Sequence, residues 1–212
     1  ARDWLGQADL VTAVDPFVAE EMRALGAKRV VVLPHFMPPD IAEPVALHGA
    51  ALNVVHTGSI ALSDPEADIG EILRPFAKAL KRNPALLLHF VGRLTDEEQN
   101  AAQTSPAAAR IVLHGVQPLA RALGFQRAAD ALIYVGSPKT RVPPSKIVEY
   151  LAATAPIIAC GRGDWRADPR VDPSDPEAAL ANLVRGAARR PVAAPPDVEA
   201  SVDALLAALR GA

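Results

Sequence analysis

Two residues, Lys146 and Glu149, have the types and spacing needed to bind a phosphorylated ligand that also carries hydroxyl groups. They lie in the segment VPPSKIVEYLA, residues 142–152, where a proline-containing loop leads into a stretch with helical periodicity. Free N–H groups and the helix dipole at such an N-terminus attract phosphate. Side chains three residues apart share one helix face, so both can enter the same cleft. The two oxygens of a carboxylate suit a vicinal diol. Alternatively, the two side chains form an ion pair on the helix surface.

Other sequence motifs for nucleotide, metal or hydrolytic chemistry are missing. The chain has no G-x-x-x-x-G-K-[ST] loop, no G-x-G-x-x-G after the first strand of either half, and no G-x-S-x-G turn. The histidines and the single cysteine do not show the spacing of metal ligands; they are His35, His48, His56, His89, His114 and Cys160. We interpret His56, His89 and His114 as residues that pack at strand ends.

The elements that must position Lys146 and Glu149 follow from an alternation of apolar runs and helical patterns. Apolar runs at 52–56, 86–91, 110–114, 131–135 and 156–160 each end near a glycine. Helical patterns are expected at 66–81, from Thr95 onward, and at 119–128, 145–153, 176–188 and 197–209. Residues 95–98 have the pattern of a capping box, with Glu98 three residues after Thr95. This alternation predicts an α/β fold with a Rossmann-like parallel sheet and helices on both faces. Ligands of such sheets bind beyond the carboxyl ends of the strands, here Gly58, Gly92, Gly115, Gly136 and Gly161.

The first part of the chain predicts a smaller strand, helix and strand. Residues 8–14 and 29–33 have strand patterns. Asp15 and Pro16 are suited to cap and open a helix that runs to about residue 25, where Gly26 ends it. Prolines then cluster between residues 34 and 44, which we interpret as a connector.

The segment around Lys146 resembles the donor-binding motif of GT-B glycosyltransferases, in particular a large retaining group whose motif reads roughly P-x-K-x-x-E-Y-x-A-x-x-x-P-[VI]-[VI]-A. Residues 144–159 match it. Weaker similarities follow in the family's order at 8–34, 54–59, 90–93, 111–116 and 129–133. The resemblance implies three regions. Residues 1–44 would be a remnant of the N-terminal GT-B domain and a linker, 45–196 the nucleotide-sugar-binding domain, and 197–212 a helix that crosses back.

The resemblance also implies a set of donor-binding residues. The residue that matches Glu149 binds the ribose hydroxyls in the family, and the loop at Gly115 and Val116 contacts the base through its backbone. The full set is Gly58, Ser59, Arg93, Gly115, Val116, Arg141, Ser145, Lys146, Ile147 and Glu149. Two departures stand out. Arg141 occupies a position where many members have glutamate, and no Arg or Lys lies between Gly58 and Gly70. Arg93, Lys139, Arg141 or Lys146 would then have to balance the diphosphate charge.

The activity implied by the resemblance is the transfer of a sugar from a nucleotide-diphosphate-sugar to a glycan or lipid-linked acceptor, as in polysaccharide biosynthesis, without a metal or other cofactor. Several catalytic residues would lie on the N-terminal domain, so we expect this chain alone to transfer no sugar. Two alternatives remain open. One is a degenerate, non-catalytic domain that binds nucleotide or acts as a scaffold. The other is a UDP-sugar 2-epimerase of the GT-B fold.

The composition indicates which classes of partner and which compartment the chain is suited to. The 212 residues carry a net charge of −2, and only 4% are aromatic, so no basic surface for nucleic acid is expected. One cysteine excludes an internal disulfide and fits a reducing compartment. No apolar run reaches the roughly 20 residues that span a bilayer. The chain begins without Met inside ordinary globular sequence, which indicates a piece of a longer protein. The resemblance implies a cytoplasmic enzyme, either free or held at the inner face of the membrane.

Overall fold

The computed structural model describes residues 2–36, 40–139, 145–188 and 198–210. It divides into two compact units. Unit 1 comprises Ala1–Pro38 and Ala193–Ala212, and unit 2 comprises Pro39–Val192. Each unit has its own sheet, so each is described separately.

Unit 1 is built around a pair of short parallel strands. It contains α1 (Arg2–Leu5), β1 (Val11–Ala13), α2 (Pro16–Ala24), β2 (Val30–Val32) and α8 (Val198–Arg210). β1 and β2 pair in parallel. The Asp15 side chain accepts a hydrogen bond from the Val18 N–H (2.9 Å), and Pro16 opens the helix. Gly26 then turns the chain with φ +104°. The expected strand, helix and strand are all present, with α2 capped as predicted.

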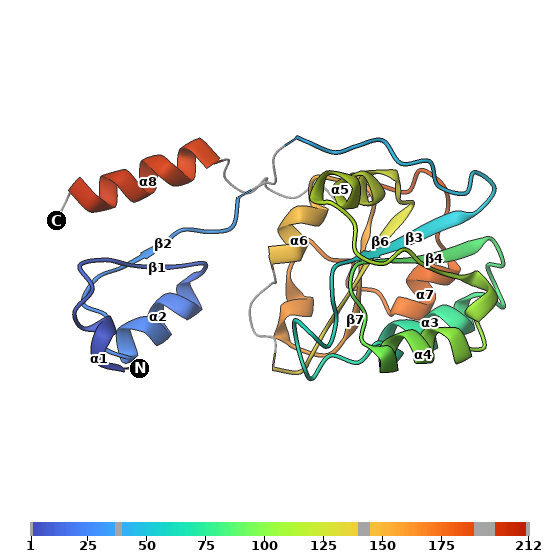
Figure 1. Cartoon of the computed structure of the whole chain (residues 1–212), viewed down its shortest axis with the longest axis horizontal. Helices are drawn as coiled ribbons and strands as arrows, with labels where there is room; N and C mark the ends of the chain where they lie inside the picture. Colours follow the sequence, from blue (N-terminus) through green and yellow to red (C-terminus); the bar gives the residue numbers. More distant parts are fainter. Residues whose placement is uncertain (1, 37–39, 140–144, 189–197, 211–212) are drawn as a thin grey trace. The chain divides into compact units, whose positions relative to one another are not determined.

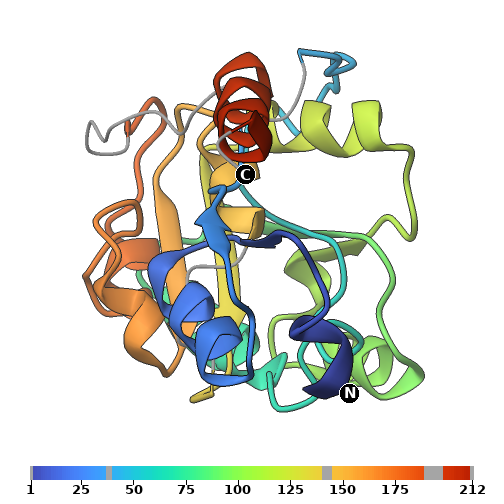
Figure 2. The ribbon, with the colours of Figure 1, turned by 90° about the vertical axis from the view of Figure 1, so that its left-hand side faces the viewer.

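Unit 2 is built around a five-stranded, all-parallel sheet. Its strands are β3 (Leu52–Thr57), β4 (Leu86–Val91), β5 (Ile111–Leu113), β6 (Ala131–Gly136) and β7 (Ile157–Gly161), in the spatial order β5-β4-β3-β6-β7. Figure 2 shows the orange segments of this unit, which include β7, at the left and its green segments at the right. The first strand of the unit is therefore central, and the order reverses at β3. The Rossmann-like parallel sheet predicted from the sequence is confirmed.

Helices cover both faces of this sheet. They are α3 (Gly70–Ala79), α4 (Asp96–Thr104), α5 (Leu119–Ala128), α6 (Ser145–Tyr150) and α7 (Pro176–Ala181), with short 3₁₀ turns at Ala108–Arg110 and Asp164–Ala167. Figure 1 shows α3, α4 and α7 gathered below the sheet and α5 above it. The core under α3 and α7 includes Val54, Leu88, Phe76, Ile133 and Leu180, all fully buried.

Besides α6, which ends at Tyr150 rather than at residue 153, two helices are shorter than their sequence patterns predicted. α3 begins at Gly70 rather than at residue 66, because the Asp68 side chain accepts a hydrogen bond from the Gly70 N–H (2.7 Å) and holds a turn instead. α7 ends at Ala181 rather than at residue 188. There the chain turns, and Gly186 has φ +75°. Neither change moves the carboxyl ends of the strands.

Candidate functional site at the carboxyl ends of the strands

Three glycines lock the tips of neighbouring strands together. The Gly58 N–H donates to the Val91 carbonyl (2.7 Å), and the Gly92 N–H donates to the Gly115 carbonyl (2.8 Å). Gly58, Gly92 and Gly115 all have positive φ, at 90°, 149° and 65°. A Cβ added to Gly92 would collide with the Gly58 carbonyl. The tips of β3 and β4 can therefore lie this close only because Gly92 has no side chain.

The ammonium of Lys146 occupies the space above Gly58. A Cβ added to Gly58 would collide with Lys146 Nζ. Lys146 lies in the first turn of α6, so its side chain reaches from the helix to the tip of the central strand. The sequence predicted that Lys146 would point toward the carboxyl ends of the strands, and in the structure it lies at the tip of β3.

Lys146 is held in an environment that disfavours its own charge. Partial burial lowers the pKa of its ammonium, while the nearby Glu149 carboxylate acts in the opposite direction. Among the ion pairs between described residues, none includes Lys146, and in particular none joins it to Glu149. The helix-surface ion pair considered as an alternative is thus not formed. A partly desolvated cation of this kind is suited to receive an anionic ligand.

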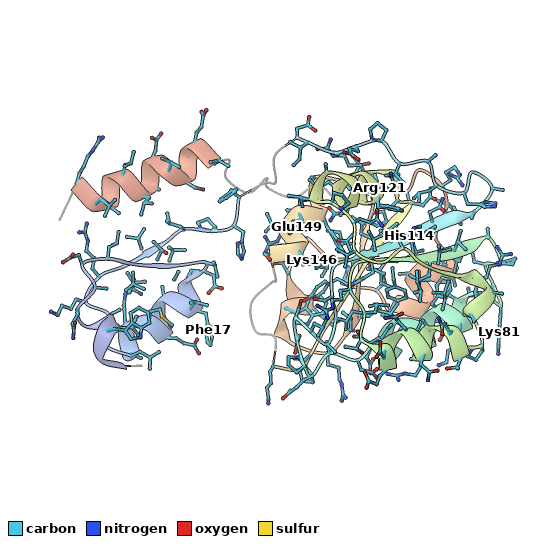
Figure 3. The ribbon with its side chains drawn as sticks, in the orientation of Figure 1. Phe17, Lys81, His114, Arg121, Lys146 and Glu149 are labelled. Atoms are coloured by element: carbon cyan, nitrogen blue, oxygen red, sulfur yellow. The ribbon has the colours of Figure 1, made fainter. Side chains whose placement is uncertain are left out.

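Glu149 and its neighbour Tyr150 both connect α6 to Thr57, the last residue of β3. The Thr57 N–H donates to the Tyr150 hydroxyl (3.0 Å), and Gln126 Nε2 donates to Thr57 Oγ1 (2.9 Å). The same Gln126 nitrogen approaches Glu149 Oε2 at 3.5 Å. These contacts place the Glu149 carboxylate near the end of β3, on the same helix as Lys146. Figure 3 shows the two labelled side chains together at one end of the sheet.

A hollow of about 520 Å³ lies beside this cluster, at the tips of β4 and β5. Apolar side chains of Leu62, Phe90, Leu113 and Val116 line it, together with the backbone of Gly92 and Gly115. Arg93, Thr95, Asp96 and Glu97 also contribute to its wall. Its size is within the range of small-molecule sites.

The predicted donor-binding residues therefore fall into two adjacent groups. Gly58, Ser59, Lys146 and Glu149 belong to the β3 and α6 cluster, and Ser145 is exposed where α6 begins. Arg93, Gly115 and Val116 line the hollow. Ile147 is fully buried, so the structure does not expose it to a ligand. Arg141 lies outside the described residues. Lys139, the remaining cation considered, already pairs with Glu66.

The histidines form contacts within the protein, as the interpretation of strand-end packing expected. His89 Nε2 lies 3.1 Å from Asn53 Oδ1, and His89 Nδ1 lies 3.0 Å from His114 Nε2. His56 Nδ1 lies 3.0 Å from the Ile133 carbonyl. Burial, and secondarily the Lys146 charge, lower the pKa of His56 to about 3. His56 is therefore neutral at physiological pH.

Within the described ranges, no group of three or more His, Cys, Asp or Glu residues could hold a metal ion. The same part of the chain contains no helix long and apolar enough to cross a membrane.

Three residues of the site were missed by the sequence argument: Gln126, Thr57 and Glu98. Gln126 and Thr57 form the link behind Glu149. Glu98 was expected only as part of a helix cap, and it also binds the loop after β3. No local signal identifies such residues, because their partners lie far away in the sequence.

No protein-family model matches this sequence, and no curated protein matches it. Solved structures, by contrast, share its fold. A complex of pneumococcal O-GlcNAc transferase GtfA with UDP and GlcNAc superposes with a TM-score of 0.59 at 14% identity, covering 85% of this chain and 39% of GtfA. A mutant of S. aureus TarM in complex with UDP, fondaparinux and α-GlcNAc-glycerol superposes with a TM-score of 0.56 at 11% identity. The superposition covers 74% of this chain and 31% of TarM.

WaaG, a glycosyltransferase of lipopolysaccharide biosynthesis, gives a TM-score of 0.55 at 17% identity, covering 82% of this chain and 51% of WaaG. The chain thus spans between about a third and a half of each of these proteins. The GT-B glycosyltransferase fold predicted from the sequence is confirmed by these likenesses.

Proposed function

We propose that this chain binds a nucleotide-diphosphate-sugar and forms the donor-binding part of a glycosyltransferase. The observation that carries the proposal is the Lys146 ammonium, partly buried above Gly58 and without an ion-pair partner among the described residues. A diphosphate placed at the tip of β3 would supply the missing negative charge. In glycosyl transfer, a cation at this position also stabilises the charge that develops on the departing nucleoside diphosphate.

The neighbouring groups fit the other parts of such a donor. The hollow at the tips of β4 and β5 combines apolar side chains with backbone and side-chain polar groups, and such a mixture suits a nucleobase. Glu149, near the end of β3, offers two acceptor oxygens for the ribose hydroxyls. The TarM and GtfA structures, which share this fold, contain UDP, and this makes UDP a reasonable first probe.

The rest of the activity is proposed from the sequence resemblance. The acceptor would be a glycan or a lipid-linked sugar, transfer would proceed with retention and without a metal, and an N-terminal GT-B domain would supply catalytic residues. The full-length enzyme would be cytoplasmic, either free or at the inner face of the membrane. We expect this chain alone to bind donor without turning it over.

Calorimetric titration of the chain with UDP, GDP and their sugars tests the proposal. Lys146→Ala is expected to weaken diphosphate binding about tenfold or more, because it removes a charge-assisted contact. Glu149→Ala is expected to weaken the binding of nucleoside diphosphates that carry an intact ribose, because it removes the acceptor oxygens for the ribose hydroxyls. Lys81→Ala is the matched control. Lys81 lies at the opposite end of the sheet (Figure 3), so its loss should leave the affinity unchanged.

Several results would contradict the proposal. If neither UDP nor GDP binds, even to the full-length protein, the non-catalytic scaffold becomes the better reading. Reversible epimerisation of a free UDP-sugar would indicate the epimerase. Equal losses in the Lys146 and Lys81 variants would show a general charge effect instead of a site. Affinity that falls when EDTA is added would contradict metal-independent binding.

A further inference from the structure

Glu98 is a buried carboxylate whose two oxygens bind different parts of the chain. Its side chain belongs to α4, and the residue is only 5% exposed. Oε2 accepts a hydrogen bond from the Thr95 N–H (2.7 Å), and Thr95 Oγ1 accepts one from the Glu98 N–H (3.2 Å). This pair is a capping box, which stabilises the first turn of a helix.

The second carboxylate oxygen of Glu98 makes a contact that is not part of the helix cap. Oε1 accepts a hydrogen bond from the Ala61 N–H (2.9 Å), 37 residues earlier in the chain. Ala61 belongs to the loop that follows β3, three residues after Gly58. Glu98 therefore joins the loop beyond β3 to the loop beyond β4.

The loop after β3 is held at a second point as well. The Asp64 side chain accepts a hydrogen bond from the Ser137 N–H (3.1 Å) beyond β6. Ile60, directly before the first anchor, is buried, and its carbonyl accepts a hydrogen bond from the Ser63 N–H (3.0 Å), which closes a turn. The loop is thus fixed between the tips of β4 and β6. Gly58, the first residue of this loop, lies beneath Lys146.

The contact with Ala61 depends on a carboxylate at position 98. Among the ion pairs between described residues, none includes Glu98, so backbone N–H groups alone balance its charge. Two acceptor oxygens serve two donors. A glutamine would present one oxygen and one NH₂ group, and the NH₂ group would face an N–H donor. One of the two loops would then be released.

We propose that Glu98 is a positioning residue, which holds the loop of residues 58–63 in place beneath Lys146 and thereby sets the affinity for the diphosphate group. This inference rests on the proposed function, since it assumes that a diphosphate binds there. It goes further in assigning a role in diphosphate binding to a residue that the ligand does not touch.

Three variants separate this role from helix capping. Glu98→Gln removes one acceptor. Ala61→Pro removes the donor at the other end of the contact, and proline suits the second position of the Ile60–Ser63 turn. Thr95→Ala is the control, because it breaks the capping box while leaving the contact between Glu98 and Ala61 intact.

Hydrogen exchange measured on the chain without ligand tests whether the contact between Glu98 and Ala61 holds the loop. We expect the amides of residues 58–64 to exchange about tenfold faster in Glu98→Gln and Ala61→Pro than in the wild type. In Thr95→Ala, faster exchange should be confined to the first turn of α4. Unchanged exchange of the loop in Glu98→Gln, or equal acceleration in Thr95→Ala, would overturn the proposal.

Affinities for UDP and uridine test the consequence. Glu98→Gln and Ala61→Pro should weaken the binding of UDP about tenfold and that of uridine by clearly less, because uridine would meet this loop only at Leu62, whereas the phosphates would lie against Gly58. A parallel loss of uridine affinity would indicate general destabilisation and refute the positioning role. If the wild type binds neither UDP nor GDP, the proposed function is wrong. In that case the exchange experiment still decides whether Glu98 holds the loop.

Discussion

At the tip of β3, two residues distant in sequence depend on each other. Gly58 has no side chain, and the space this leaves is occupied by the ammonium of Lys146. The family pattern places cations in the loop after this glycine, and this chain has none between Gly58 and Gly70. Lys146 brings a positive charge to the same strand tip from α6. It is therefore the residue on which donor binding should depend most.

Gly92 offers a test of how closely the strand tips must approach. Its φ of +149° is a conformation that only glycine adopts readily, and a Cβ would collide with the Gly58 backbone. We expect Gly92→Ala to lower the free energy of unfolding by about 3 kcal/mol, measured by urea denaturation. Gly186→Ala is the control. Gly186 also has a positive φ, but a side chain there would face open space, so we expect a loss of about 1 kcal/mol in the free energy of unfolding. Equal losses would show that strain alone matters.

His56 should make the fold sensitive to acid. Its pKa is about 3 in the folded chain and 6.5 for an unperturbed histidine, so between these pH values the unfolded chain binds the extra proton. Stability is therefore full above pH 6.5 and falls as the pH falls toward 3. From about pH 7.5 to about pH 5, His56 should account for a loss of about 2 kcal/mol.

His56→Asn isolates this contribution, because the Asn amide can still donate to the Ile133 carbonyl but does not titrate. We expect the variant to be less stable at neutral pH and to have a shallower dependence of unfolding free energy on pH, measured by urea denaturation at several pH values. His89 and His114 have lowered pKa values too, mainly because of burial, and their contribution should remain. An unchanged slope would contradict the assignment to His56.

At the scale of elements, a segment that precedes the sheet is fastened along α5. This linker strap, residues 40–45, runs over α5, where the Glu43 N–H donates to the Ala120 carbonyl (2.9 Å) and Arg127 pairs with Asp40 (2.5 Å). Gly124 allows the close approach, since a Cβ there would collide with the Glu43 carbonyl. The strap can lie against the helix only because residue 124 has no side chain.

Gly124→Ala should therefore displace the strap. Alanine favours the helix by up to about 1 kcal/mol, which offsets part of the lost contact, so the overall stability should change little. Faster hydrogen exchange in residues 40–45 is the expected effect. Arg127→Ala removes only an exposed ion pair and should leave exchange there nearly unchanged. Unchanged exchange in Gly124→Ala would show that the strap tolerates a side chain.

The elements that the sequence predicted well are those with strong local patterns. The runs that became β4 and α5 match their predicted bounds, and the Asp15 cap of α2 was expected from its residue type. Lys146 and Glu149 were found because they lie three residues apart in one recognisable segment. Residues that act across the fold gave no such signal. Glu98 was visible as a cap but not as a partner of Ala61, and the fit of Gly124 against Glu43 depends on contacts that only folding creates.

At the scale of the molecule, the division into two units predicts that unit 2 folds without unit 1. Unit 2 has its own five-stranded sheet and buried core, and both groups of the candidate site lie within it. We expect residues 39–192, produced alone, to unfold cooperatively in urea and to bind nucleoside diphosphate with an affinity within about threefold of the whole chain. A fragment that folds but does not bind would show that unit 1 contributes to the site.

The central position of β3 has a consequence for how unit 2 is made on the ribosome. β3 is the first of its strands to be synthesised, yet it is flanked on both sides in the finished sheet. On one side Leu52 pairs with Leu86, and on the other the contact between His56 and Ile133 spans 77 residues. One hydrogen-bonding edge of β3 must therefore wait for β6 to emerge. A nascent chain that stalls before residue 131 would expose one edge of this strand, and such chains should be the ones most dependent on chaperones.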